Sequence, residues 1–304
     1  MYRFIFQLDY FDSLFLKEVF KGKENKRNPY LFFTAKAKNV TINCYKDKKS
    51  NYKAVFTSND KDSLLKQARR FKPYVLSSNI TNDDIKNKFV VLNKQIGSDE
   101  VGKGDFFGPL IVVASYVEEK DIKLLDELKV TDSKKISDAN HLQIGKILKR
   151  KIKNYSICIS PSKLTKMNEE GINVNKALAL LHNLAHQKLI EKYNLSSDIP
   201  VYVDQFESLD AYKSQLKDSI IKNELFFQTQ GESHYPSVAV SSCIARYIFL
   251  TKWKEMEEKF NTTIPKGATS YVNKAYLKIR KTYSKEDLKP YVKTFFKTYD
   301  KVEK

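Results

Sequence analysis

The stretch IGSDEVGKGDFFGPLIVVASYV, residues 96–117, decides the fold of this chain. It sets two adjacent carboxylates, Asp99 and Glu100, at the end of an apolar run, and a second apolar run, 110–117, follows a turn with three glycines. This pattern predicts a strand, a loop and a second strand. Adjacent acids beside an apolar run raise the free energy of the folded protein through repulsion and desolvation unless a cation or hydrogen-bond donors offset it. A divalent metal ion is the simplest offset, and an acidic hairpin turn is the alternative.

The tripeptide Gly102-Lys103-Gly104 inside this turn suits a polyanion, because glycine lets a ligand approach the backbone amides and the lysine adds positive charge. The net charge of +18 agrees with this interpretation. Residues 1–72 contribute +10, from 17 Lys and Arg against 7 Asp and Glu, and residues 273–304 contribute +6. Two basic ends predict nucleic-acid binding. The alternative is a Lys-rich and Asn-rich composition that reflects an AT-biased genome.

Length and composition predict a soluble protein with one large and one small domain. The chain has 304 residues, 41% of them hydrophobic, and it contains no apolar run of about 18 residues such as a membrane span requires. Its N-terminus alternates like a strand and lacks the cleavage site of a signal peptide. Cys44, Cys158 and Cys243 lie far apart, which predicts neither a disulfide framework nor a zinc site. We therefore expect a cytoplasmic protein.

The first part of the chain predicts a small α+β domain. Alternating residues predict strands over 4–11, 31–37, 40–45 and 53–56, and a helix over 63–71. Residues 72–87 have the polar composition of a linker. The domain boundary is expected near residue 85, which gives domains 1–85 and 86–304.

The second part predicts a mixed α/β sheet flanked by helices. Beyond the two strands around Asp99, helices are expected over 121–128, from the loop 131–138 to about 151, over 172–192 and over 236–260. Further strands are expected over 155–160, 200–206 and 224–228. Strands that alternate with helices favour this architecture.

Two further acids occupy positions that suit a shared site. Asp204 ends the apolar run PVYVDQF, as Asp99 ends the first strand, and Glu232 lies just before the helix 236–260. Strand ends are where α/β sheets place their sites. Four carboxylates suit two magnesium ions, which can activate a water molecule and stabilise the leaving oxygen of a phosphodiester. Surface solvation remains the usual reason for an acid.

The segments GSDEVGKGDFFGP, DSKK, VYVDQF and VAVSSCIARY, in this order and spacing, together resemble bacterial ribonuclease HIII. Residues 32–56 are similar to the TATA-binding-protein-like substrate domain of that family, and PKGATSYVN, residues 265–273, is similar to its C-terminal PKGA segment. The resemblance implies a ribonuclease H-like fold with a small N-terminal domain and a basic C-terminal helical segment. It also implies an endoribonuclease that cuts the RNA strand of RNA/DNA hybrids and leaves 5′-phosphate and 3′-hydroxyl ends.

Carried over residue by residue, the resemblance makes Asp99, Glu100, Asp204 and Glu232 the catalytic acids that bind Mg²⁺ or Mn²⁺, two ions when substrate is bound. For Glu232 the alternative is Glu224, because the family commonly shows Lys-Ala-Glu where this chain reads Gln230-Gly231-Glu232. The residues predicted to bind substrate are Ser98, Gly102, Lys103, Gly104, Lys134, Lys36 and Tyr45. Asp132 and Lys134 of the DSKK loop either brace the site or touch the substrate.

Histidines and aromatic residues give weaker indications. His182 and His186 have metal-ligand spacing, but Asn183 stands where a zinc protease has its glutamate, so a packed or surface pair is expected. His234 is a candidate proton carrier beside Glu232. Among aromatic residues, Phe33, Tyr45 and Tyr52 are candidate contacts to bases or sugars.

The predicted function is hydrolysis of the RNA strand of RNA/DNA hybrids by a monomer, with RNA selectivity from 2′-hydroxyl contacts near the Gly-Lys-Gly turn. One alternative is ribonuclease HII-like cleavage at single ribonucleotides in DNA. The other is a non-catalytic nucleic-acid-binding protein.

Overall fold

The structure is a computed structural model that describes residues 1–8, 10–24, 28–47, 51–68, 75–78, 94–130 and 137–303. Contacts between residues divide the chain into two units, Met1–Leu92 and Asn93–Lys304. The predicted boundary near residue 85 lies outside the described residues. Each unit has a hydrophobic core of its own.

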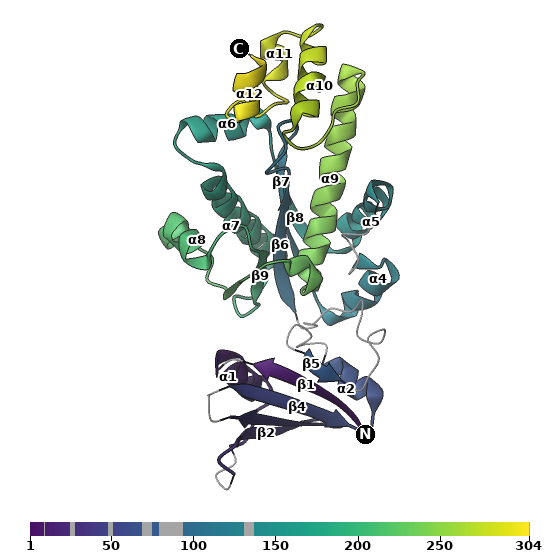
Figure 1. The fold of residues 1–304 in the computed structure, drawn as a ribbon, viewed down its shortest axis with the longest axis vertical. Coiled ribbons are helices and arrows are strands. Elements are labelled where there is room, and N and C mark those ends of the chain that lie inside the picture. Colours follow the sequence, from purple (N-terminus) through teal and green to yellow (C-terminus); the bar gives the residue numbers. More distant parts are fainter. Residues whose placement is uncertain are drawn as a thin grey trace. The chain divides into compact units, whose positions relative to one another are not determined.

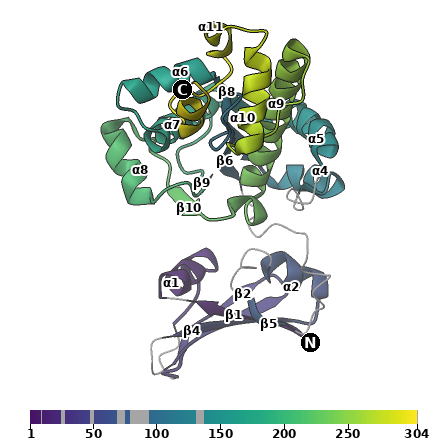
Figure 2. The same ribbon diagram turned by 45° about the horizontal axis from the view of Figure 1, so that its top comes forward.

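The first unit is a five-stranded antiparallel sheet in the order β2-β3-β4-β1-β5. Alternation along its strands directs Phe4, Phe6, Phe33 and Phe56 to one face, where they form the core with side chains of two helices. Figure 2 shows both helices on this face. The elements are β1 (Tyr2–Leu8), α1 (Tyr10–Val19), β2 (Leu31–Ala37), β3 (Val40–Lys46), β4 (Tyr52–Ser58), α2 (Lys61–Ala68) and β5 (Val75–Ser78).

The second unit is a five-stranded mixed sheet in the order β10-β9-β6-β7-β8. Its middle is the predicted hairpin, β6 (Gln95–Val101) and β7 (Leu110–Val117), which pairs antiparallel. Strand β7 is buried along its whole length, so both faces of the sheet must be covered. The outer strands are β8 (Lys153–Ile159), antiparallel to β7, and β9 (Val201–Asp204) and β10 (Leu225–Gln228), which run parallel to β6.

Helices cover the two faces of this sheet, as Figure 1 shows. One face carries α7 (Val174–Tyr193) and α8 (Leu209–Leu216), and the other carries α5 (Asp138–Lys151) and α9 (Pro236–Phe260). The remaining elements are η2 (Glu119–Asp121), α4 (Ile122–Glu127), α6 (Pro161–Glu169), η4 (Lys217–Ser219), η5 (Gly231–Ser233), α10 (Ser270–Arg280), α11 (Lys285–Leu288) and α12 (Lys297–Val302).

Helix α9 lies directly on β6 because small side chains meet at the contact. The Ser237 hydroxyl donates to Gln95 Oε1 at 2.7 Å, and the Ser241 hydroxyl donates to the carbonyl oxygen of Gly97 at 2.9 Å. A Cβ on Gly97 would lie 2.4 Å from the backbone nitrogen of Val238, so only glycine permits this approach. The contact fixes the start of α9 against the strand that carries Asp99 and Glu100.

The predicted fold class is confirmed, and most predicted elements agree with the structure to within a few residues. Two predictions were wrong, and two helices were missed. The first strand ends at Leu8, and a helix, α1, occupies the rest of the predicted segment. The predicted linker contains an edge strand, β5, which pairs with β1. Helices α6 and α8 were not predicted, because each is short and follows directly on a strand region.

No helix in the described part of the chain is long and apolar enough to cross a membrane. All three cysteines are free, with Cys44 and Cys243 buried and Cys158 exposed. None of the three takes part in a disulfide in this structure.

Candidate active site

Four acids from distant parts of the second unit line one pocket of about 350 Å³. Asp99 and Glu100 lie near the end of β6. Parallel pairing of β6 with β9 sets Ser98 opposite Val203, which brings Asp204 to the same edge of the sheet. Glu232 lies in the short helix η5, which packs against β9 and the start of α9.

Burial and mutual repulsion dominate the electrostatics of this pocket. Asp99 is 8% exposed, and Glu232 is 7% exposed. Desolvation, followed by the charges of Glu100 and Asp204, raises the pKa of Asp99 well above its usual range. Hydrogen bonds from the Ser242 side chain and from the backbone N–H of Glu100, at 2.7 Å, offset part of this effect. A cation bound in this pocket would offset both the desolvation and the repulsion.

The donor set fits a hard divalent cation, because it consists of carboxylate oxygens. In the described ranges, no three His, Cys, Asp or Glu side chains stand around a common point as ligands of one ion. Protein donors contact not only Asp99 but also Asp204 and Glu100: Asp204 Oδ1 accepts from the backbone N–H of Gly231 at 2.8 Å, and Glu100 Oε2 lies 3.3 Å from His182 Nε2. The pocket therefore brings the four carboxylates together without arranging three of them as ligands of one ion in the described ranges.

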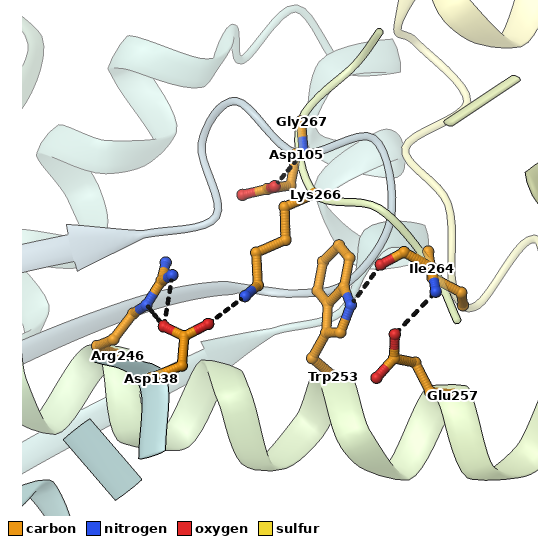
Figure 3. A network of polar contacts seen from close by, with 8 residues as sticks. All are labelled: Asp105, Asp138, Arg246, Trp253, Glu257, Ile264, Lys266 and Gly267. Carbon is orange, nitrogen blue, oxygen red and sulfur yellow. Dashed lines mark hydrogen bonds and ion pairs between the residues drawn. The ribbon is translucent and has the colours of Figure 1, made fainter. Parts of the chain in front are cut away.

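Further polar side chains line the same pocket, and the sequence alone did not point to them: His141, Gln230, Ser242 and Arg246. Ser242 and Arg246 lie one helical turn apart on α9. This spacing is visible in the sequence, and it predicts that both side chains lie on the same face of the helix. Arg246 brings a guanidinium group to a pocket of four acids. Figure 3 shows how it is held: Nη2 of Arg246 donates to Asp138 Oδ1 at 2.9 Å, and Nζ of Lys266 donates to Asp138 Oδ2 at 2.7 Å.

The Gly-Lys-Gly turn is fixed at its base and open at its tip. Gly102 has a φ of +97°, and a Cβ there would lie 2.2 Å from the carbonyl oxygen of Pro109, so the position requires glycine. Gly104 is exposed, and a Cβ there would meet no atom within 4 Å. Nζ of Lys103 lies 5.8 Å from the centre of the Phe206 ring. A ligand can therefore reach the backbone at Gly104.

The C-terminal part of the chain holds this turn from behind. The backbone N–H of Gly267 donates to Asp105 Oδ1 at 2.6 Å, a contact drawn in Figure 3. Lys293 is fully buried, and its ammonium group donates to the carbonyl oxygens of Asp105, at 2.5 Å, and of Gly108, at 2.9 Å. Burial lowers the pKa of Lys293 to about 7. The segments around residues 267 and 293 thus fix the turn to the body of the unit.

A family model described as ribonuclease HII matches residues 96–299. Ribonuclease HIII of Bacillus mycoides is 38% identical over 208 residues, which are 68% of this chain and 67% of that protein. The chain belongs to the ribonuclease HIII family. The crystal structure of Bst-RNase HIII in complex with Mn²⁺ is 26% identical, covers 99% of this chain and 98% of its own, and has a TM-score of 0.67. Aquifex aeolicus RNase H3, 22% identical with a TM-score of 0.54, supports the fold alone.

The resemblance of the sequence to ribonuclease HIII is thereby confirmed. The structure also distinguishes the two candidates for the fourth acid, Glu232 and Glu224. Glu232 lines the pocket with the other three acids. Glu224 is exposed and precedes β10, at the opposite end from Gln228, which pairs with Asp204. The geometry therefore favours Glu232 over Glu224. Asp132 and Lys134 lie outside the described residues.

The predicted substrate contact of Ser98 needs correction. Its side chain is fully buried, and its hydroxyl lies 2.8 Å from a ring nitrogen of each of two histidines, His182 and His186. Its side chain therefore faces α7 and is not accessible to a ligand. Both histidines are fully buried as well, so of the packed or surface pair that the sequence predicts, the packed pair is present. His234 is half-buried at the end of η5 and is not among the residues that line the pocket, whereas His141 is.

Three aromatic residues of the N-terminal sheet were predicted to contact the substrate, and they lie on different faces of the sheet. Phe33 and Tyr52 are buried in the core, so the prediction that they contact bases or sugars was wrong. Tyr45, 37% exposed, lies on the other face. We call this the exposed face of the N-terminal sheet, and it carries Arg3, Thr34, Lys36, Thr41, Asn43, Tyr45 and Lys53.

Proposed function

We propose that this chain is a metal-dependent endoribonuclease that cleaves the RNA strand of RNA/DNA hybrids. The observation that carries the proposal is the pocket in which Asp99, Glu100, Asp204 and Glu232 converge, in a member of the ribonuclease HIII family. Surface solvation does not account for these acids, because two of them are more than nine-tenths buried.

The same four acids would hold Mg²⁺ or Mn²⁺, and two ions with substrate bound. Their carboxylate oxygens suit such ions, and a relative of similar fold has been crystallised with Mn²⁺. When bound, the ions supply the Lewis acidity that phosphodiester hydrolysis requires. The side chains of the chain itself position the substrate. Arg246, which is held by Asp138, can bind a phosphate group at the edge of the pocket through its guanidinium group.

Substrate selectivity is assigned to the Gly-Lys-Gly turn. The exposed backbone at Gly104 and the ammonium group of Lys103 lie where a sugar-phosphate backbone can approach closely. Selectivity for RNA requires contact with the 2′-hydroxyl group, since only that group distinguishes ribose from deoxyribose. We assign this contact to the turn.

The N-terminal residues, 1–85, are assigned to binding of the hybrid, and residues 86–304 to cleavage. The exposed face of the N-terminal sheet supports this division. It presents Lys36, Lys53 and Arg3 together with the partly exposed ring of Tyr45, a combination of positive charge and an aromatic surface that suits nucleic acid.

A cleavage assay with three substrates tests the proposal. The substrates are an RNA/DNA hybrid, a DNA duplex that contains one ribonucleotide, and double-stranded DNA, each with Mg²⁺, with Mn²⁺ and with a chelator. We expect cleavage of the hybrid with either ion and none with the chelator. If the hybrid stays intact with both ions, the chain is a non-catalytic binding protein. Preferential cutting at the single ribonucleotide would favour the ribonuclease HII-like alternative, which the matching family model keeps open.

We also propose that the protein acts as a monomer in the cytoplasm. Three unpaired cysteines, one of them exposed, suit a reducing compartment. Light scattering during gel filtration measures the mass directly, and a value near twice 35.3 kDa would contradict the monomer.

A further inference from the structure

A chain of polar side chains lies buried between the sheet and α7, behind Glu100. Ser98 on β6 and His182 and His186 on α7 are each fully buried. The Ser98 hydroxyl oxygen lies 2.8 Å from Nδ1 of His182 and 2.8 Å from Nε2 of His186. Nε2 of His182 lies 3.3 Å from Oε2 of Glu100. Three buried polar groups thus connect in a line to one acid of the pocket.

The positions of the protons along this line follow from hydrogen-bond chemistry. An ionised carboxylate only accepts, so Nε2 of His182 carries a proton. If the His182 ring is neutral, its Nδ1 accepts the Ser98 hydroxyl proton, and the Ser98 oxygen then accepts from Nε2–H of His186. Nδ1 of His186 is left without a proton, and it has no hydrogen-bond partner among the described residues. This is the one arrangement in which both rings are neutral and all three hydrogen bonds of the line are formed.

The alternative arrangement is unfavourable. If Ser98 donated to His186 instead, His182 would be a buried cation, and the neutral ring of His186 would carry its proton on Nδ1. That N–H would be buried without an acceptor in the described structure, which costs free energy. Burial, followed by the nearby His182 ring, lowers the pKa of His186 to about 3, so a neutral His186 is expected.

A second contact fixes the plane of the His182 ring. The ring of Phe206 stacks on it, with centroids 4.9 Å apart and an interplanar angle of 20°. Phe206 lies two residues beyond Asp204, the last residue of β9, so the segment that leaves this strand places the ring. His182 is therefore held by stacking, by Ser98 and by its place on α7, and its Nε2–H points to Glu100 from a fixed position.

We propose that His182, with Ser98 and His186 behind it, is a positioning residue that orients the Glu100 carboxylate for binding of the metal ion. The inference rests on the metal-dependent activity proposed above. A carboxylate with one oxygen held loses less side-chain freedom when its other oxygen binds an ion, and hydrogen bonds to metal ligands commonly change metal affinity. His182 and His186 have the spacing of zinc ligands, but here they position the carboxylate of Glu100.

Two substitutions of His182 separate its contacts. In His182→Gln the amide nitrogen replaces Nε2, so the hydrogen bond to Glu100 is kept and that to Ser98 is removed. In His182→Asn the amide replaces Nδ1, so the hydrogen bond to Ser98 is kept and that to Glu100 is removed. Binding of Mn²⁺ to the substrate-free protein is measured by calorimetry at a fixed, mildly alkaline pH. We expect His182→Asn to weaken binding about 10-fold or more and His182→Gln to weaken it about 3-fold or less.

The matched control is Asn183→Ala, on the same helix. Asn183 donates to the carbonyl oxygen of Ser219 at 2.8 Å and accepts from the backbone N–H of Ile221, so its removal also breaks buried hydrogen bonds on α7, away from the acids. We expect it to lower the melting temperature without change in Mn²⁺ affinity. If both His182 variants behave like this control, or weaken binding equally, the positioning role is overturned. If the wild-type protein itself binds no Mn²⁺, the proposed function fails instead.

Nitrogen-15 NMR of the histidine rings gives a readout that does not depend on activity. The chain has four histidines, so single substitutions assign every signal. We expect a proton on Nε2 of both rings and none on Nδ1 of His186. A proton on Nδ1 of His186, or a His182 ring without a proton on Nε2, would overturn the proposed arrangement.

Discussion

At the scale of single residues, Asp99 combines burial with two neighbouring negative charges. The substitution Asp99→Asn removes one charge and keeps the shape of the side chain. We expect it to abolish cleavage while hybrid binding stays within about threefold, because the basic contacts are untouched. Without metal, the melting temperature should rise by about 2–4 °C for each kcal/mol of repulsion that is relieved. Activity assays, filter binding and calorimetry check this, and a fully active variant would rule out the site.

Lys293 gives a prediction on pH. Its pKa is about 7 in the folded protein and near 10.5 in the unfolded chain, so the unfolded chain binds more protons between these values. The free energy of unfolding contributed by this group therefore rises as the pH increases from about 7 to about 10.5. Between pH 7 and 9 the gain should be about 2 kcal/mol. Denaturant unfolding of wild type and Lys293→Met at both pH values measures it, and equal pH dependence in the two proteins would contradict it.

The sequence predicted the acids of the site better than their surroundings. Asp99 and Asp204 each end an apolar run, which is an unusual place for an acid. His141, Ser242 and Arg246 lie on helices α5 and α9, where polar residues usually face solvent, so their sequence positions do not distinguish them. The prediction for Ser98 was wrong because it was carried over with the motif as a whole, whereas the position of Ser98 on β6 directs its side chain to α7.

At the scale of elements, the contact between β6 and α9 determines how the acids meet. Gly97→Ala would place a methyl group 2.4 Å from backbone and side-chain atoms of Ser237 and Val238. We expect a loss of about 1–3 kcal/mol in the free energy of unfolding and a lower kcat, because the start of α9, next to Glu232, must move away from Asp99. Denaturant unfolding and steady-state kinetics provide the measurement.

Gly104→Ala is the matched control, because a Cβ there meets no atom within 4 Å. Its free energy of unfolding should stay within about 0.5 kcal/mol of wild type. If the Gly-Lys-Gly turn contacts the hybrid, KM should rise in this variant alone. Equal stability of the two variants would show that the close approach of β6 and α9 does not constrain the site.

Helices and strands whose sequence has a clear start residue or a long apolar pattern were predicted well. Helix α9 begins at Pro236 and ends at Phe260 as expected, since proline marks the first turn and the long apolar pattern sets the length. The aromatic-rich segment after Leu8 continues the pattern of the strand in the sequence, but α1 begins at Tyr10. In β2, Phe32 and Phe33 are adjacent, so alternation alone does not tell which of them faces the core.

At the scale of the whole molecule, the positive charge of residues 1–72 motivates the proposal that the N-terminal part binds the hybrid while the rest of the chain cleaves it. We expect deletion of residues 1–85 to raise KM far more than it lowers kcat, because contacts remote from the acids bind ground state and transition state nearly equally. Each phosphate that the truncated protein no longer binds should flatten the dependence of log affinity on log salt by about 0.7 to 0.9. Steady-state kinetics and binding at several salt concentrations measure both quantities.

A domain that only shields the catalytic sheet would behave differently. Its deletion would lower the melting temperature and leave the salt dependence unchanged. An unchanged salt dependence together with an unchanged KM would contradict the assignment of the N-terminal residues to substrate binding.

The order of the acids along the chain sets an order of events during synthesis on the ribosome. The N-terminal unit has its own core, so it can fold once residues 1–92 have emerged. The pocket needs Asp99, Asp204 and Glu232 together with α9, and the turn at Gly104 is fixed only when Lys293 arrives. If the N-terminal unit binds the hybrid as proposed, a nascent chain can bind substrate some two hundred residues before its catalytic pocket is complete.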